Sequence, residues 1–248
     1  MSGMGKIAKH QRRAMRQAVR GLRQGIFQTS PEWARSAVGP MVNWADMLLV
    51  DHGIFRLAYL NLHKLGATAW RSAQPAPHQI GRLARAGIRT IVNLRGARYC
   101  GSYWLEQKAC TRHGVRLVDY QVRSRAAPSR EEVLGARDLF KQLEGPVLFH
   151  CKSGADRAGL MSTLYLIAVE GVPVDVARRQ LDWRFGHIRQ SDTGVLDYFF
   201  ECYLEDNARS PIEFFHWVET VYDADQVKQS FVAKGWANVI TNRILRRE

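Results

Sequence analysis

The chain has 248 residues, of which 46% are apolar, so it can bury the core of one generous domain with extensions. Its net charge of +13 predicts a negatively charged partner: a phosphorylated substrate, an anionic membrane surface or nucleic acid. The spacing of the four cysteines argues against a disulfide framework or a zinc site, and no metal or other cofactor is expected. No run approaches the roughly 18 apolar residues of a transmembrane helix, and the basic N-terminus lacks the apolar core of a secretory signal, so we expect a cytoplasmic protein.

Residues 1–40 are predicted to form a basic amphipathic arm. Residues 1–30 carry seven Lys or Arg and no acid, with apolar residues at helical spacing. Two interpretations stay open: a helix lying on anionic lipid headgroups, which would make the protein peripheral on the inner membrane, or a solvated basic tail. A nucleic-acid arm is disfavoured because no aromatic interleaving accompanies the charge. Ser30-Pro31 is expected to open a further helix, which Gly39-Pro40 closes.

Residues 41–65 are predicted to be an apolar helical linker that packs on the core. The alternative is that part of this segment contacts lipid. Within it, the pair Asp51-His52 is expected to be no more than a turn or a cap.

Residues 66–205 show strands alternating with helices. This order predicts an α/β fold, a central and mostly parallel sheet flanked by helices, with helical extensions at both ends. The expected strands are 70–72, 88–94, 115–120 and 147–149. The expected helices are 78–86, 102–113, 130–143, 158–170, 172–183 and 195–204. Residues 206–248 are predicted to be a C-terminal helical extension, with helices at 212–221 and 236–247.

The stretch GPVLFHCKSGADRAG at residues 145–159 carries the chemistry. A buried strand, a compact loop and a helix start together direct backbone N–H groups and the positive end of a helix dipole to one point, which binds phosphate. Cys151, at the start of the loop, is expected to be a thiolate nucleophile. Arg157, at its end, can bind two phosphoryl oxygens at once. Cys110 and Arg116 have the same separation, but no strand leads into Cys110 and no helix follows Arg116, so Cys110 is predicted to be a buried structural cysteine.

His-Cys-Lys-Ser-Gly-Ala-Asp-Arg-Ala-Gly resembles the signature loop of the cysteine-dependent protein tyrosine phosphatase superfamily, in its compact dual-specificity branch. A second block is similar to the opening of bacterial atypical dual-specificity enzymes: Trp70-Arg71-Ser72-Ala73-Gln74-Pro75 followed by Gly87-Ile88-Arg89-Thr90-Ile91-Val92-Asn93-Leu94-Arg95. The resemblance covers residues 66–205.

This resemblance implies hydrolysis of a phosphate monoester through a cysteinyl-phosphate on Cys151, without a metal. The phosphate would be held by the loop, whose residues are Lys152, Ser153, Gly154, Ala155, Asp156 and Arg157. Arg95 leaves its strand at the carboxyl edge of the sheet, where ligands bind, and Arg125 stands in the neighbouring loop. Both are candidates for substrate contact.

The sequence departs from the family pattern at two places. Ala158 replaces the hydroxyl residue that often follows the arginine. Two interpretations stay open: the hydrolysis step is slower, or another donor such as His150 or Ser153 substitutes for the missing hydroxyl. The usual acid loop, residues 121–129, contains no carboxylate, and Asp119 before it is expected to be structural. Asp156 is therefore the candidate proton donor, as in the similar loops of myotubularins and lipid-active bacterial phosphatases; the alternative is that it only orients Arg157.

The leading hypothesis for the substrate is a phosphorylated lipid at the inner membrane surface, because the loop contains Asp-Arg and the chain is strongly basic. The likeness permits phosphatidylglycerophosphate or lipid A phosphates. The alternatives are a phosphotyrosine or dual-specificity protein phosphatase and, from another class, a non-catalytic phosphate-binding adaptor.

Overall fold

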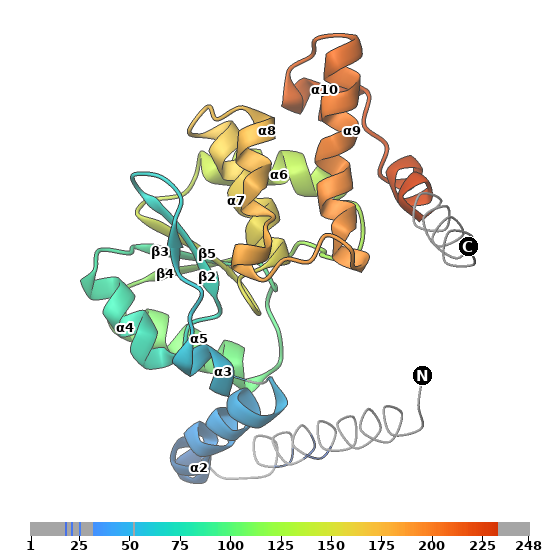
Figure 1. The fold of residues 1–248 in the computed structure, drawn as a ribbon. Coiled ribbons are helices and arrows are strands. Elements are labelled where there is room, and N and C mark those ends of the chain that lie inside the picture. Colours follow the sequence, from blue (N-terminus) through green and yellow to red (C-terminus); the bar gives the residue numbers. More distant parts are fainter. Residues whose placement is uncertain (1–17, 19–20, 22–24, 26–31, 52, 233–248) are drawn as a thin grey trace.

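The computed structural model describes residues 32–51 and 53–232, together with positions 18, 21 and 25 (Figure 1). Its centre is a five-stranded sheet in the order β1-β2-β5-β3-β4. Only β1 is antiparallel to its neighbour. The strands are β1 (His63–Lys64), β2 (Ala69–Ala73), β3 (Thr90–Asn93), β4 (Arg116–Asp119) and β5 (Val147–Cys151). The predicted α/β class is confirmed, and the sheet begins before the expected start of the domain at residue 66.

Helices cover both faces of the sheet, as Figure 1 shows. On one face, α4 (Pro77–Arg85) and α5 (Gly101–His113) bury Ile91 and Leu148. On the other face, α6 (Arg130–Phe140), α7 (Asp156–Ala168) and α9 (Val195–Arg209) bury Val92 and Phe149. Successive residues of β3 and β5 therefore point to opposite cores, as the two-residue repeat of a strand requires, and β5 is buried along its whole length.

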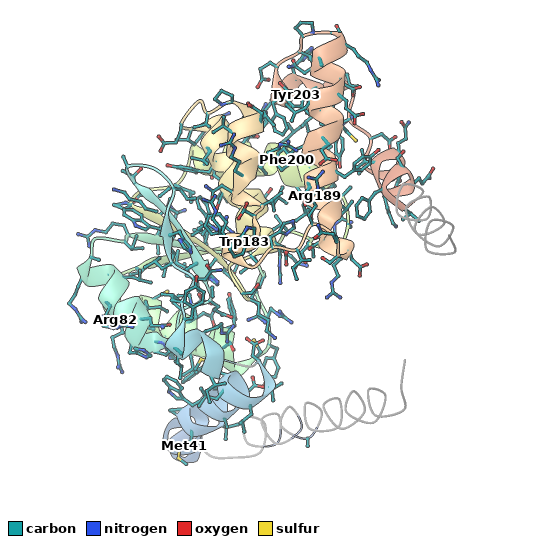
Figure 2. All side chains as sticks on the ribbon, in the orientation of Figure 1. Met41, Arg82, Trp183, Arg189, Phe200 and Tyr203 are labelled. Atoms are coloured by element: carbon teal, nitrogen blue, oxygen red, sulfur yellow. The ribbon has the colours of Figure 1, made fainter. Side chains whose placement is uncertain are left out.

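The N-terminal segment is built differently from the prediction. Helix α2 (Glu32–Ala45) runs through Gly39-Pro40, where we expected an end, and continues into the π-helix η1 (Asp46–Val50). The proline removes one backbone donor, but the packing of α2 on α5 maintains the helix. A short helix α3 (Ile54–Ala58) follows. Met47 packs with Leu105 of α5 and with neighbouring tryptophans, whereas Met41 is exposed at the outer end of α2 (Figure 2).

The segment after α7 also corrects a prediction. Instead of one helix over 172–183, the chain forms α8 (Val174–Ala177) and three short 3-10 turns, η2 (Arg178–Gln180), η3 (Trp183–Phe185) and η4 (Asp192–Gly194). The Gln180 carbonyl accepts a hydrogen bond from Arg71 at 2.5 Å instead of continuing a helix, and the Asp182 side chain caps the next turn.

Helix α9 crosses the predicted boundary at residue 205 and is followed by α10 (Phe214–Thr220). Phe200, which Figure 2 labels on α9, is fully buried, and so is Trp217 of α10. The predicted helices within 1–30 and at 236–247 lie outside the described residues, apart from isolated positions. Within the part of the chain that the structure describes, no helix has the length and apolarity needed to cross a bilayer.

Candidate active site

The loop that joins β5 to α7 carries the predicted nucleophile. Cys151 is the last residue of β5 and is 2% exposed, and α7 begins at Asp156. Between them, Gly154 has φ +77°, and a Cβ there would lie 2.6 Å from the backbone nitrogen of Ala73. Glycine is therefore needed at this position, both for the left-handed backbone and for the close approach of the loop to β2.

Arg71 of β2 supports this loop through hydrogen bonds to its carbonyl groups. Its side chain is fully buried, and its Nη2 donates to the carbonyl oxygens of Gly154 at 2.6 Å and Ala155 at 2.9 Å. In a trans peptide the N–H points opposite to the C=O, so the amide groups that follow these carbonyls face the other side, where a phosphate would sit. Burial lowers the pKa of Arg71 to about 10, against the opposing effect of Cys151 and Asp156, so the guanidinium remains a cation at neutral pH.

Asn61 is a second support of the loop. Its Nδ2 donates to the Ser153 carbonyl at 3.0 Å and to the Phe185 carbonyl at 2.9 Å. Its φ of 52° lies in the left-handed region, which asparagine tolerates better than most residues. Asn61 thereby ties the loop to the segment that contains η3.

Arg157 lies in the first turn of α7, is partly exposed, and donates to the Leu94 carbonyl at 3.5 Å. It lines a cleft of about 350 Å³ together with Arg125, which is exposed. Arg123 lines the same cleft but is paired with Glu132 at 3.1 Å. The structure thus places Arg125, a predicted substrate contact, beside Arg157.

Asp156 meets a partner that the sequence did not indicate. Its Oδ1 lies 2.8 Å from Nδ1 of His187, whose Nε2 lies 2.7 Å from Oδ2 of Asp197 on α9. We call these three residues the His187 cluster. The histidine side chain is 1% exposed. Burial alone would lower the pKa of His187, but the hydrogen bonds to Asp156 and Asp197 and their charges raise it to about 9.

A second cluster is centred on Asp51 and includes Lys152 of the loop. The Asp51 carboxylate accepts from Arg95 at 2.6 and 2.9 Å and from Arg56 at 3.1 Å, and it lies 3.3 Å from Nζ of Lys152. Ser102 also donates to it, at 2.8 Å. We call these five residues the Asp51 cluster. Burial alone would raise the pKa of Asp51, but the three cations hold it well below its usual range.

The Asp51 cluster changes the interpretation of two predictions. Arg95, expected as a substrate contact, is 6% exposed and its guanidinium is occupied by Asp51 and Gln74. Asp51, expected to be a turn or a cap, instead joins the N-terminal segment to Arg95, which follows β3, and to Lys152 in the loop between β5 and α7. No local signal reveals this, because Asp51 and Arg95 are 44 positions apart in the sequence.

The remaining predicted residues have defined places. Ser153 is exposed on the loop, and Ala155 and Ala158 are buried. His150 is fully buried with its Nε2 2.7 Å from Glu106 Oε1. Asp119, at the end of β4, accepts from Asn93 at 2.7 Å and from the Tyr103 hydroxyl, which is a structural role. Among the described residues, no group of three His, Cys, Asp or Glu side chains is arranged to hold a metal ion.

Comparison with known proteins identifies the family. A family model described as dual-specificity protein tyrosine phosphatase fused to NAD⁺ kinase matches residues 60–193, which is more than half of the chain. The chain belongs to this family, and the matched region is its phosphatase domain.

The chain is also similar to individual proteins. The dual specificity protein phosphatase TpbA of Pseudomonas aeruginosa strain UCBPP-PA14 is 32% identical over 113 residues, which are 45% of this chain and 49% of TpbA. The chain thus spans about half the length of the curated relatives it matches. A crystal structure of P. aeruginosa TpbA aligns with a TM-score of 0.48 at 22% identity, over 71% of this chain and 92% of the crystallised chain. A structure of PTPMT1 aligns with a TM-score of 0.44 at 21% identity, over 60% and 99% of the two chains.

Proposed function

We propose that the protein is a phosphate monoester hydrolase that works through a cysteinyl-phosphate on Cys151. The observation that carries the proposal is the loop itself: Cys151 ends a buried strand, Arg157 opens the following helix, and Arg71 takes two loop carbonyls on the side away from the phosphate position. Membership of a dual-specificity phosphatase family agrees with it.

The reaction has two steps. In the first, Cys151 Sγ attacks phosphorus, the bond to the leaving oxygen breaks, and Asp156 gives that oxygen a proton. In the second, the Asp156 carboxylate takes a proton from water, which attacks phosphorus and releases the thiolate and inorganic phosphate. The loop amides and Arg157 stabilise the charge on the equatorial oxygens in both steps.

The direct test is hydrolysis of an aryl phosphate by Cys151→Ser. We expect a loss of about 10⁴-fold or more, because the nucleophile is removed. The matched control is Cys110→Ser, a buried cysteine on α5 that should retain full turnover per folded molecule. Equal activity of Cys151→Ser and wild type would refute the proposal, and absence of turnover in wild type with tight phosphate binding would favour the non-catalytic adaptor.

We further propose that the substrate is a phosphorylated lipid presented by an anionic membrane. Next to the catalytic loop, Trp183 is 81% exposed and Ile188 is 60% exposed. Figure 2 shows Trp183 at the lower end of α7. Trp183 borders a cleft of about 450 Å³ that is also lined by three arginines, Arg178, Arg179 and Arg189, and by three aspartates, Asp175, Asp182 and Asp197. An exposed tryptophan among arginines suits the boundary between acidic headgroups and acyl chains.

Vesicle flotation tests this substrate class. Trp183→Ala should reduce recovery with vesicles containing phosphatidylglycerol, and phosphatidylcholine vesicles should recover little of either protein. The control is Met41→Ala, which removes a side chain of α2 that is 73% exposed. If Trp183→Ala floats like wild type, the proposed membrane face is wrong.

A second candidate is a dual-specificity protein phosphatase, because TpbA, 32% identical over 113 residues, carries that name. The two candidates differ in the substrate that the enzyme prefers. A higher kcat/KM on a phosphotyrosine peptide than on a vesicle-borne lipid phosphate monoester would favour the protein substrate.

A further inference from the structure

The segment that follows α7 places a buried imidazole behind the proton donor. His187 lies between Asp156 of α7 and Asp197 of α9, with N to O distances of 2.8 and 2.7 Å. Its own backbone N–H donates to the Asp182 carbonyl at 3.2 Å, which fixes the ring in this position. The histidine is 2% exposed, whereas the Asp156 side chain is 26% exposed. His187 is therefore buried, whereas the Asp156 side chain reaches the surface at the start of α7.

The two contacts determine how many protons the cluster holds. A neutral imidazole has one N–H, so one of its nitrogens would turn a lone pair toward a carboxylate oxygen at hydrogen-bond distance, which is repulsive. The arrangement is satisfied when both nitrogens carry protons, or when one nitrogen and one carboxyl group do. The cluster thus contains a proton that can lie either on His187 or on Asp156.

We propose that His187 is the positioning residue that supplies Asp156 with the proton for the leaving group. In the first chemical step the Nδ1 proton passes to the Asp156 carboxylate, and the carboxyl group delivers it to the leaving oxygen. His187 becomes neutral. It keeps the proton on Nε2, which remains hydrogen-bonded to Asp197. In the second step the proton taken from water returns through Asp156 to Nδ1, so no proton is gained or lost over one cycle.

This role answers a chemical difficulty of a carboxyl donor. An ordinary aspartic acid is almost fully ionised at neutral pH, so it has no proton to give. On the outer side, Arg178 and Arg189 approach Glu201 at 3.6 Å and closer, and Arg184 is paired with Asp182 at 3.1 Å. Asp156 and Asp197 together outweigh the effect of burial on the charge of the His187 ring and raise its pKa to about 9. The ring therefore carries the second proton in the physiological pH range.

The inference rests on the proposed phosphatase activity, and two substrates separate them. A phenolate leaves with little help, whereas an alkoxide needs a proton donor. His187→Gln should therefore lower kcat on an alkyl phosphate by about 10²-fold at pH 7.5 and change kcat on an aryl phosphate by less than about threefold. The activity of wild type on the alkyl phosphate should persist until the pH rises through about 9. The activity of His187→Gln on the same substrate should already fall as the pH rises through the acidic range.

The control is His113→Gln, an exposed histidine on α5, which should leave both substrates unaffected. Asp197→Asn keeps the imidazole but removes one carboxylate, so the alkaline limb on the alkyl substrate should move to lower pH. Equal losses on alkyl and aryl phosphates in His187→Gln would show a merely structural role and overturn the inference. Failure of wild type to hydrolyse either ester would instead contradict the proposed function. The NMR titration of the His187 ring in the full chain needs no turnover, and titration at the ordinary 6.5 would also overturn the inference.

Discussion

The two ionic clusters that contact the loop between β5 and α7 have opposite compositions. The Asp51 cluster surrounds one carboxylate with three cations, and the His187 cluster places one imidazole between two carboxylates. In the first, the cations hold the pKa of Asp51 well below its usual range, so this carboxylate stays ionised at neutral pH. The second has a group with a pKa of about 9. The comparison indicates that the Asp51 side of the loop is a fixed support, whereas the His187 side can exchange a proton.

The largest effect on stability should come from breaking the fixed support. Asp51→Asn leaves Arg56 and Arg95 buried without a carboxylate, which should lower the free energy of unfolding by about 3–5 kcal/mol. Urea unfolding at pH 7 measures it. The control is Asp138→Asn, which removes an exposed partner of Lys141 and should leave the urea unfolding curve close to that of wild type. Because the pKa of Asp51 is depressed on folding, its contribution should be present above its unfolded pKa near 3.8 and should disappear on further acidification.

The His187 cluster should show the opposite pH dependence. The pKa of His187 is raised from 6.5 to about 9 on folding, so its contribution is complete below pH 6.5 and is lost as the pH rises through 9. Compared with wild type, the free energy of unfolding of His187→Gln should be lower by about 3 kcal/mol at low pH and nearly unchanged above pH 9. Chemical unfolding at a series of pH values between 6 and 10 tests this. A constant difference across that range would show that the two clusters do not differ in the way described.

The smallest effect should follow from the one exposed cation of the Asp51 cluster. Lys152 is 38% exposed, so Lys152→Met should change the free energy of unfolding by less than about 1 kcal/mol. If Lys152 contacts an anionic headgroup, KM for a lipid phosphate should rise while kcat on an aryl phosphate is unchanged. A loss of stability as large as that of Asp51→Asn would mean that Lys152 belongs to the buried support.

The sequence predicted those features whose signals are local. The strands β3 and β5 are short apolar runs bounded by turn residues, and the expected helix before the loop is present as α6. The loop from Cys151 to Arg157 could be identified from the sequence because a strand leads directly into it and a helix follows it directly.

The supports of the loop carry no such signal. Arg71 reaches Gly154 across 83 positions, and Asp156 meets His187 across 31. Their roles depend on which side chains the fold brings together. The expected helix over 172–183 failed for the same reason, since Arg71 binds the Gln180 carbonyl and ends the helix early.

The proposed reaction requires covalent transfer of the phosphoryl group to Cys151. Its most direct test is an acid quench of wild-type protein during turnover of an aryl phosphate, followed by mass analysis of the peptide that contains residue 151. We predict one added phosphoryl group on the Cys151 sulfur, absent in Cys151→Ser. Steady phosphate release from wild type with no phosphorylated Cys151 at any quench time, and undiminished release from Cys151→Ser, would contradict the account.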